Sequence, residues 1–590
     1  MERILRKGRG EERMKLILQY MKRYKGLVLL NILSVFGFAL VELGIPTLVS
    51  NMIDEGVLRQ DKGYLLQSGA VIAVISLIGV CGTILLGYCC AKISTAVTRD
   101  IRNDVFARVQ SFSHAEMNRF GVSSLITRTN NDAFQILTFM NVILRTALLT
   151  PVMIVVSFTL TISSSLELSL IIASTIPIIV IGVVAVGKAS APISERQQSS
   201  LDRLNRIFRE NLTGIRVIRS FNNDRHETER FDQENRFYMK QSRSLFKLMS
   251  STEPVFFLVM NLAALAIYYV AAGMIDADIL QVGKLVAFME YLFHAMLSVM
   301  LFCTVFMMYP RASVSAKRIQ AVLKTSSSVK EPQDPALLED IEEIAFDHVT
   351  FVYPDGEEAV LKDVSFTVRK GETIAFIGST GSGKSTLVSL VPRFYDVSDG
   401  TVRINQKDVR EYDLQQLRAK IGYVAQKAVL FRGSIADNIR FGKKDASSAE
   451  VEHAARVAQA YEFIDEKPQR FDERMVEGAT NVSGGQKQRL SIARALVRRP
   501  QIYIYDDSFS ALDFATDAKL RKELKEEVKD AIMMIVAQRV STIMDADRIV
   551  VLNEGKVAGI GTHSELLKSC QIYHEIAASQ LSEEELAYGK

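Results

Sequence analysis

The fold of this chain is decided by the stretch Gly378-Ser379-Thr380-Gly381-Ser382-Gly383-Lys384-Ser385, which Thr386 continues. Its spacing is that of a complete phosphate-binding loop. An apolar run, 373–377, precedes the loop, and a helix is expected to begin near Lys384. In such a loop, backbone N–H groups surround the phosphates, the lysine reaches the β- and γ-phosphates, and the serine hydroxyl holds Mg²⁺. The stretch therefore predicts a site for ATP and Mg²⁺ on an α/β sheet.

Two later stretches offer groups that can bind a metal ion or a phosphate. The apolar run Gln501-Ile502-Tyr503-Ile504-Tyr505-Asp506-Asp507 predicts a strand ending in two acids. The first acid, Asp506, is expected to hold Mg²⁺ beside Ser385, either as a direct ligand or from the outer shell. Upstream lies the turn Ser483-Gly484-Gly485-Gln486. A small turn at the start of a helix offers a hydroxyl and free N–H groups to a phosphate, so this turn is predicted to bind one.

The first half of the 590-residue chain is dominated by apolar runs. Six segments are long and apolar enough to span a bilayer: 26–53, 66–93, 136–162, 167–187, 254–275 and 285–308. The connections after the second and fourth segments are long and rich in arginine, whereas the others are short. The tendency of positive charge to stay inside predicts that the N-terminus, both long loops and the C-terminal half are cytoplasmic. The net charge of +4 is small and uninformative by itself, and no nucleic-acid partner is expected.

Taken together, these motifs resemble those of ABC exporter half-transporters. The segments 120–132 and 212–221 resemble the two intracellular loops of that family. Tyr353 matches the aromatic residue that stacks on adenine, and Gln426 matches the glutamine that ligates Mg²⁺ and senses the attacking water. Ser483, Gly484, Gly485 and Gln486 match the signature that contacts ATP held by the opposite subunit.

The resemblance implies a type I exporter fold. This is an all-α transmembrane domain of six helices with long cytoplasmic helical loops, followed by an α/β P-loop ATPase domain. The expected divisions are a basic N-terminal segment 1–25, a transmembrane domain 26–312, a linker 313–340, a nucleotide-binding domain 341–580 and a tail 581–590. The implied location is the bacterial plasma (inner) membrane.

Two positions depart from the family pattern. Asp507 stands where the family has the catalytic glutamate, and Gln538 stands where it has a histidine that touches the γ-phosphate. An aspartate carboxylate is withdrawn by about 1.5 Å, one C–C bond length. Misplacing a reacting group by about 1 Å can cost about a hundredfold in rate. Glutamine donates a hydrogen bond but carries neither proton nor charge as imidazole does. The prediction is a site that binds ATP well and hydrolyses it slowly.

This combination resembles the degenerate-site subunit of heterodimeric bacterial multidrug exporters. The resemblance implies ATP-driven export of amphipathic compounds or drugs, with a second half-transporter that bears the catalytic glutamate and histidine. Ser483 and Gly485 would then complete the competent site of that partner. Two alternatives stay open, a homodimeric lipid or drug flippase and a membrane ATP sensor that transports nothing.

Four ionisable residues interrupt the apolar segments: Glu42, Arg145, Glu290 and His294. Charges at such depth are costly and tend to face a cavity or a partner. Glu290 and His294 are four residues apart and share one helix face. One interpretation is a cavity for cationic or amphipathic substrates. The other is internal pairing, such as Arg145 with Glu42 or Glu290.

Overall fold

The computed structural model describes residues 15–582 and residue 586. Within these residues the chain forms two compact units. The helical unit comprises the chain up to Gln110 together with Ser123–Thr325. The α/β unit comprises Ser111–Val122 and the chain from Ser326 onward. The short segment Ser111–Val122 is therefore part of the α/β unit, although it lies between two stretches of the helical unit.

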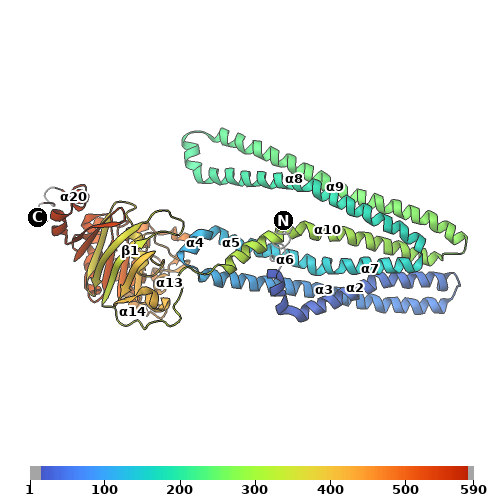
Figure 1. Cartoon of the computed structure of the whole chain (residues 1–590), viewed down its shortest axis with the longest axis horizontal. Helices are drawn as coiled ribbons and strands as arrows, with labels where there is room; N and C mark the ends of the chain where they lie inside the picture. The colour runs from blue at the N-terminus through green and yellow to red at the C-terminus, as the bar shows by residue number, and fades with distance from the viewer. Residues whose placement is uncertain (1–14, 583–585, 587–590) are drawn as a thin grey trace. The chain divides into compact units, whose positions relative to one another are not determined.

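The helical unit consists of long helices, several of which are continuous with shorter helical pieces (Figure 1). Its elements are η1 (Lys22–Tyr24), α2 (Lys25–Asn51), η2 (Met52–Val57), α3 (Lys62–Gln110), α5 (Val122–Thr127), η3 (Arg128–Asp132), α6 (Ala133–Val142), η4 (Ile143–Ala147), α7 (Leu148–Ser164), α8 (Leu166–Ser220), α9 (Asp224–Asp276) and α10 (Val282–Lys324). Six helices among the described residues are long and apolar enough to cross a membrane, which confirms the six predicted segments.

The apolar composition of these helices suits a bilayer, because every backbone N–H and C=O of a helix interior is bonded within the helix. Large apolar side chains face outward, as at Leu66 and Leu166, which are 78% and 66% exposed. Helix α8 has 55 residues. At 1.5 Å per residue it is about 80 Å long, well over the roughly 30 Å hydrocarbon core of a bilayer. Its polar part must therefore extend beyond the membrane, as the long helical loops were predicted to do.

The α/β unit is built on a six-stranded sheet of order β12-β11-β3-β10-β9-β6. The strands are β3 (Thr373–Gly378), β6 (Ile421–Val424), β9 (Ile502–Asp506), β10 (Ile532–Val536), β11 (Arg548–Asn553) and β12 (Lys556–Gly561). All neighbouring pairs are parallel except β11 with β12. The carboxyl ends of β3 and β9 consequently meet at one edge of the sheet, where open α/β sheets bind ligands.

A second sheet has the order β2-β1-β4-β5, and a two-stranded ribbon pairs β7 with β8. These strands are β1 (Glu343–Phe351), β2 (Leu361–Arg369), β4 (Asp399–Ile404), β5 (Lys407–Asp408), β7 (Gly433–Ser434) and β8 (Arg474–Met475). The helices are α11 (Lys384–Leu390), α12 (Leu414–Ala419), α13 (Ile435–Arg440), α14 (Ser448–Val457), α15 (Tyr461–Asp465), α16 (Gly484–Leu496), α17 (Phe514–Glu527), α18 (Val540–Ile543), α19 (His563–Ser569) and α20 (Gln571–Ala578), with 3₁₀ turns η5 (Val409–Glu411), η6 (Arg470–Asp472) and η7 (Glu477–Ala479).

Two apolar clusters cover the two faces of the six-stranded sheet. Along β9, Tyr503 and Tyr505 pack into one cluster, while Ile502 and Ile504 pack into the other. This alternation is the period of two that a strand imposes. Because both faces are covered, β9 is buried along its whole length. The two acids at its end are thereby held on a rigid strand.

Helix α4 (His114–Phe120) is a short helix of the α/β unit. Ser113 begins it with a capping box, in which Ser113 accepts from the Ala115 N–H and Glu116 accepts from the Ser113 N–H. Glu116 also accepts from the backbone N–H of Ser328 at 3.1 Å. At its other end, the Asn118 side chain donates to the Tyr395 hydroxyl at 3.3 Å. These contacts fix α4 against the α/β core.

Candidate nucleotide-binding site

The phosphate loop lies where the sequence places it, between β3 and α11. Gly378 and Gly383 have φ of +156° and +97°, and a Cβ at Gly378 would come within 2.0 Å of the Leu552 carbonyl oxygen. Only glycine fits that close approach. The Lys384 ammonium donates to the Gly378 and Ser379 carbonyls, each at 2.8 Å, which keeps it inside the loop. Burial lowers the pKa of Lys384, and the charges of Asp507 and Asp506 oppose that shift.

Asp506 ends β9 beside the loop and is 5% exposed. Ser385 Oγ donates to its Oδ1 at 2.6 Å, and the Tyr423 hydroxyl donates to its Oδ2 at 3.1 Å. Burial, with a contribution from Asp507, raises the pKa of Asp506. A serine hydroxyl beside a buried carboxylate is the hard-oxygen donor set that Mg²⁺ prefers, so Ser385 and Asp506 fit this ion. The metal would neutralise phosphate charge there.

The three predicted catalytic residues come together at Asp507, which is 7% exposed. Gln426 Nε2 donates to Asp507 Oδ2 at 3.0 Å, and Gln538 Nε2 donates to the same oxygen at 2.7 Å. Asp507 has a left-handed backbone, with φ of +49°. Aspartate tolerates this conformation better than longer residues do.

A hollow of about 300 Å³ connects these groups. Its lining comprises Val360, Thr380, Gly381, Gly383, Lys384, Ser385, Thr386, Gln426, Asp507, Val536 and Gln538. Tyr353 lies next to it, with its hydroxyl 2.9 Å from Thr386 Oγ1 and its ring edge-on to Tyr395 at 5.3 Å. The structure thus gathers most of the predicted site residues in one place.

The turn Ser483–Gln486 lies elsewhere, since none of the described residues that line the hollow belongs to it. Ser483 is the N-cap of α16, and its Oγ accepts from the Gln486 N–H at 3.3 Å. Ser483 and Gly484 are exposed. A Cβ at Gly485 would lie 3.0 Å from the Ala511 carbonyl oxygen. The predicted phosphate-binding turn therefore presents an accessible helix start, apart from this chain's own loop.

Of the four ionisable residues predicted within the apolar segments, Glu42 and His294 lie close enough to pair. His294 Nε2 lies 3.5 Å from Glu42 Oε2, which joins α10 to α2. Nearby, the Thr47 and Tyr291 hydroxyls are 2.6 Å apart. Glu290 and Arg145 are exposed. Internal pairing thus involves Glu42 with His294, a combination that the sequence alone did not single out.

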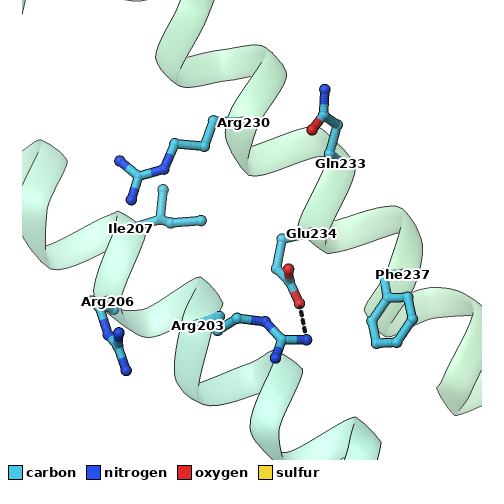
Figure 2. A pocket seen from close by; sticks show the side chains of 7 residues that line it. All are labelled: Arg203, Arg206, Ile207, Arg230, Gln233, Glu234 and Phe237. Atoms are coloured by element: carbon cyan, nitrogen blue, oxygen red, sulfur yellow. Dashed lines mark ion pairs between the residues drawn. The ribbon is translucent and has the colours of Figure 1, made fainter.

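A second hollow, of about 430 Å³, lies between α8 and α9 and is lined by Arg203, Arg206, Ile207, Arg230, Gln233, Glu234 and Phe237 (Figure 2). Arg203 pairs with Glu234 at 2.9 Å, and Arg230 pairs with Glu210 at 2.9 Å. Acids therefore already balance two of its arginines. The phosphate loop, with its backbone cradle and free lysine charge, is the better nucleotide site.

Sequence reasoning used Tyr423 only as part of the pattern around Gln426. Its hydrogen bond to Asp506 arises because β6 lies beside β9, where Tyr423 is paired with Ile504. The sequence did show a tyrosine within a short apolar strand three residues before Gln426. The pairing of these two strands could not be read from spacing.

Comparison with known proteins agrees with this geometry. Residues 28–300 match the ABC transporter transmembrane region, and residues 361–510 match the ABC transporter family. An uncharacterized ABC transporter ATP-binding protein of Mycobacterium tuberculosis is 36% identical over 570 residues, covering 96% of this chain and 98% of that protein. An ATP-dependent lipid A-core flippase of Alkalilimnicola ehrlichii is 30% identical over 563 residues, covering 94% of each.

Among solved structures, a bacterial Atm1-family ABC exporter with ATP bound matches with a TM-score of 0.78 and 25% identity, covering 95% of this chain and 99% of that one. The match includes both the six-helix part and the α/β part. The chain is thus an integral membrane protein with an ABC ATPase domain. It belongs to the ABC transporter family, as an exporter half-transporter of the type I fold.

Proposed function

We propose that this chain is one half of a heterodimeric ABC exporter and that its own ATP site, loaded with Mg²⁺, turns over slowly. The observation that carries the proposal is the contact of Asp507 with two glutamine side chains. Both Gln426 and Gln538 donate to one carboxylate oxygen, at 3.0 and 2.7 Å. All the groups expected to bind phosphate and metal are kept alongside it.

A general base must lie within hydrogen-bond reach of the water and accept its proton. One oxygen of Asp507 is already engaged by two neutral amides, neither of which can take up a proton. The carboxylate is also about 1.5 Å shorter in reach than a glutamate would be. Both effects slow proton removal without weakening the contacts that Lys384, Ser385 and Asp506 can make. The site would therefore be occupied by ATP but hydrolyse it slowly.

The partner in this proposal is a second half-transporter that carries the catalytic glutamate and histidine. Ser483 and Gly484 are exposed at the start of α16, where they can receive a phosphate from outside this chain. Gly485 follows them, and a Cβ there would lie 3.0 Å from the Ala511 carbonyl oxygen. One subunit would therefore serve two sites, its own slow site and the partner's fast site.

The transported compounds are proposed to be amphipathic molecules or drugs, with cations favoured. Glu290 is exposed on α10, one turn from the Glu42–His294 pair. An acid on a membrane-depth helix face attracts a cationic group in a dehydrated setting. The arginine-rich loops favour an orientation with both termini inside. The similarity to bacterial relatives favours a bacterial plasma membrane location.

A second candidate is a homodimeric lipid flippase. It is favoured by the 30% identity to a lipid A-core flippase, which extends over 94% of this chain. In that case aspartate and glutamine would have to support hydrolysis without a partner.

Affinity purification of the tagged chain from its native membrane, followed by mass spectrometry, separates the two. The heterodimer predicts a stoichiometric second half-transporter with glutamate and histidine at the positions of Asp507 and Gln538. It also predicts little ATPase activity from the chain alone. A self-associated chain that hydrolyses ATP at the rate of the native complex would overturn the heterodimer and support the flippase.

A further inference from the structure

Both oxygens of the Asp506 carboxylate are held by side chains from other elements. Ser385, at the start of α11, donates to Oδ1, and Tyr423, on β6, donates to Oδ2. Two donors on opposite oxygens set the plane of a carboxylate as well as its position. Tyr423 is therefore placed to orient Asp506, as outer-shell residues orient metal ligands.

The Tyr423 hydroxyl acts only as a donor to Asp506. A carboxylate oxygen can only accept, so the hydroxyl is the donor of this 3.1 Å contact. Its hydrogen bond to a carboxylate is charge-assisted and is stronger than a bond between neutral groups.

The ring of Tyr423 is in turn part of a chain of contacts that reaches α4. Phe394 meets it edge-on, with ring centroids 5.2 Å apart at 77°. Phe394 also lies against His114, with ring centroids 4.6 Å apart at 32°. Each step is a direct packing contact within the α/β unit. His114 is the first residue of α4, the helix that the chain forms between two stretches of the helical unit.

We propose that Tyr423 is a positioning residue that orients Asp506, and that it makes metal–nucleotide binding respond to the contact between His114 and Phe394. The half-buried rings of Phe394 and Tyr423 touch, and the exposed His114 lies against Phe394. A displacement of His114 is therefore expected to move Phe394 and Tyr423 and to turn the carboxylate. The inference rests on the proposed role of Ser385 and Asp506 in holding Mg²⁺.

The test measures the Mg²⁺ concentration that gives half-maximal binding of a fluorescent ATP analogue to the full-length chain in detergent. Tyr423→Phe keeps the ring and removes the hydroxyl. It should raise that concentration about tenfold to a hundredfold, the usual effect of losing an outer-shell partner. His114→Ala should shift it in the same direction by less. Tyr503→Phe is the matched control, since its side chain packs into the cluster on the other face of the sheet and should change nothing.

The combination His114→Ala with Tyr423→Phe decides the coupling. If the ring contacts act in series, the double variant should have the same Mg²⁺ requirement as Tyr423→Phe alone. If the two residues act independently, their effects on the Mg²⁺ requirement should multiply. Multiplication would overturn the link to α4. Should His114→Ala misfold, Phe394→Leu interrupts the same series of ring contacts. Its effect on the Mg²⁺ requirement should likewise not multiply with that of Tyr423→Phe.

Asp506→Asn separates this inference from the assignment of the metal site. If neither Asp506→Asn nor Tyr423→Phe alters the Mg²⁺ requirement, the proposed metal site is wrong. If Asp506→Asn raises the requirement and Tyr423→Phe does not, the metal site stands and the positioning role of Tyr423 is overturned.

Discussion

Replacing Asp507 and Gln538 together by glutamate and histidine should restore hydrolysis at this chain's own site. The present contact of Gln538 with Asp507 is 2.7 Å long, and that of Gln426 is 3.0 Å. A carboxylate advanced by about 1.5 Å would collide with both amides unless they moved. Asp507→Glu alone should therefore gain little, and the two changes should be strongly non-additive.

The magnitude follows from the displacement. Moving the carboxylate into reach removes a misplacement of more than about 1 Å, worth roughly a hundredfold in rate or about 2.7 kcal/mol. Each single variant should gain less than about tenfold. The left-handed backbone at position 507 should also cost the longer side chain about 1 kcal/mol of stability, visible as a lower melting temperature.

The assay is single-turnover hydrolysis of γ-labelled ATP by the complex, with the partner's catalytic carboxylate replaced by an amide so that only this site can react. Lys384→Ala provides the blank, because it removes the cation that reaches the phosphates. Equal rates for the wild-type and double-variant chains, at equal ATP occupancy, would refute the explanation of slow turnover by Asp507 and Gln538.

Three further predictions address other parts of the structure. Gly485→Glu adds bulk and negative charge at the start of α16 and should abolish most steady-state ATPase activity of the complex. Asp507→Asn should lower that activity by less than about tenfold. If Asp507→Asn lowers the activity more than Gly485→Glu does, the roles assigned to the two sites are exchanged. In a cysteine-free background, a cysteine at Gln60 should react with an impermeant thiol reagent in whole cells, and a cysteine at Arg219 should not. Labelling at Arg219 would mean that the predicted membrane topology is inverted. Burial, with the charge of Arg418, lowers the pKa of His114. Because the docked form disfavours the charged ring, docking of α4 is fully stabilised above about pH 6.5 and weakens as pH falls below it. The protection factors of the amides over Ser111–Val122, taken relative to their intrinsic exchange rates, should therefore fall at pH 5.5. An equal fall in His114→Gln would assign the effect to another group.

Much of the fold was predictable because its signals are local. The phosphate loop carries its own strand and helix context, and α11 begins at Lys384 as expected. Long apolar runs identify helices that cross a membrane without knowledge of their neighbours. Ser483 and Gln486 form a capping box, which sequence spacing indicates.

The contacts that explain the site are tertiary and could not be predicted in the same way. Residues 426, 507 and 538 meet only because β6, β9 and β10 are adjacent in the sheet. Spacing along the chain does not say which glutamine reaches which carboxylate oxygen. The same reasoning applies to Glu42, where sequence offered Arg145 as a partner and helix packing brings His294 instead.

The central claim is that this chain's site holds ATP without hydrolysing it quickly. The most direct measurement is the chemical identity of nucleotide retained by the native complex after several turnovers with doubly labelled ATP and Mg²⁺. The account predicts that one nucleotide per complex is recovered as intact ATP and that Lys384→Ala in this chain abolishes this retained fraction. Recovery of only ADP from this site, at the rate of the complex as a whole, would contradict it.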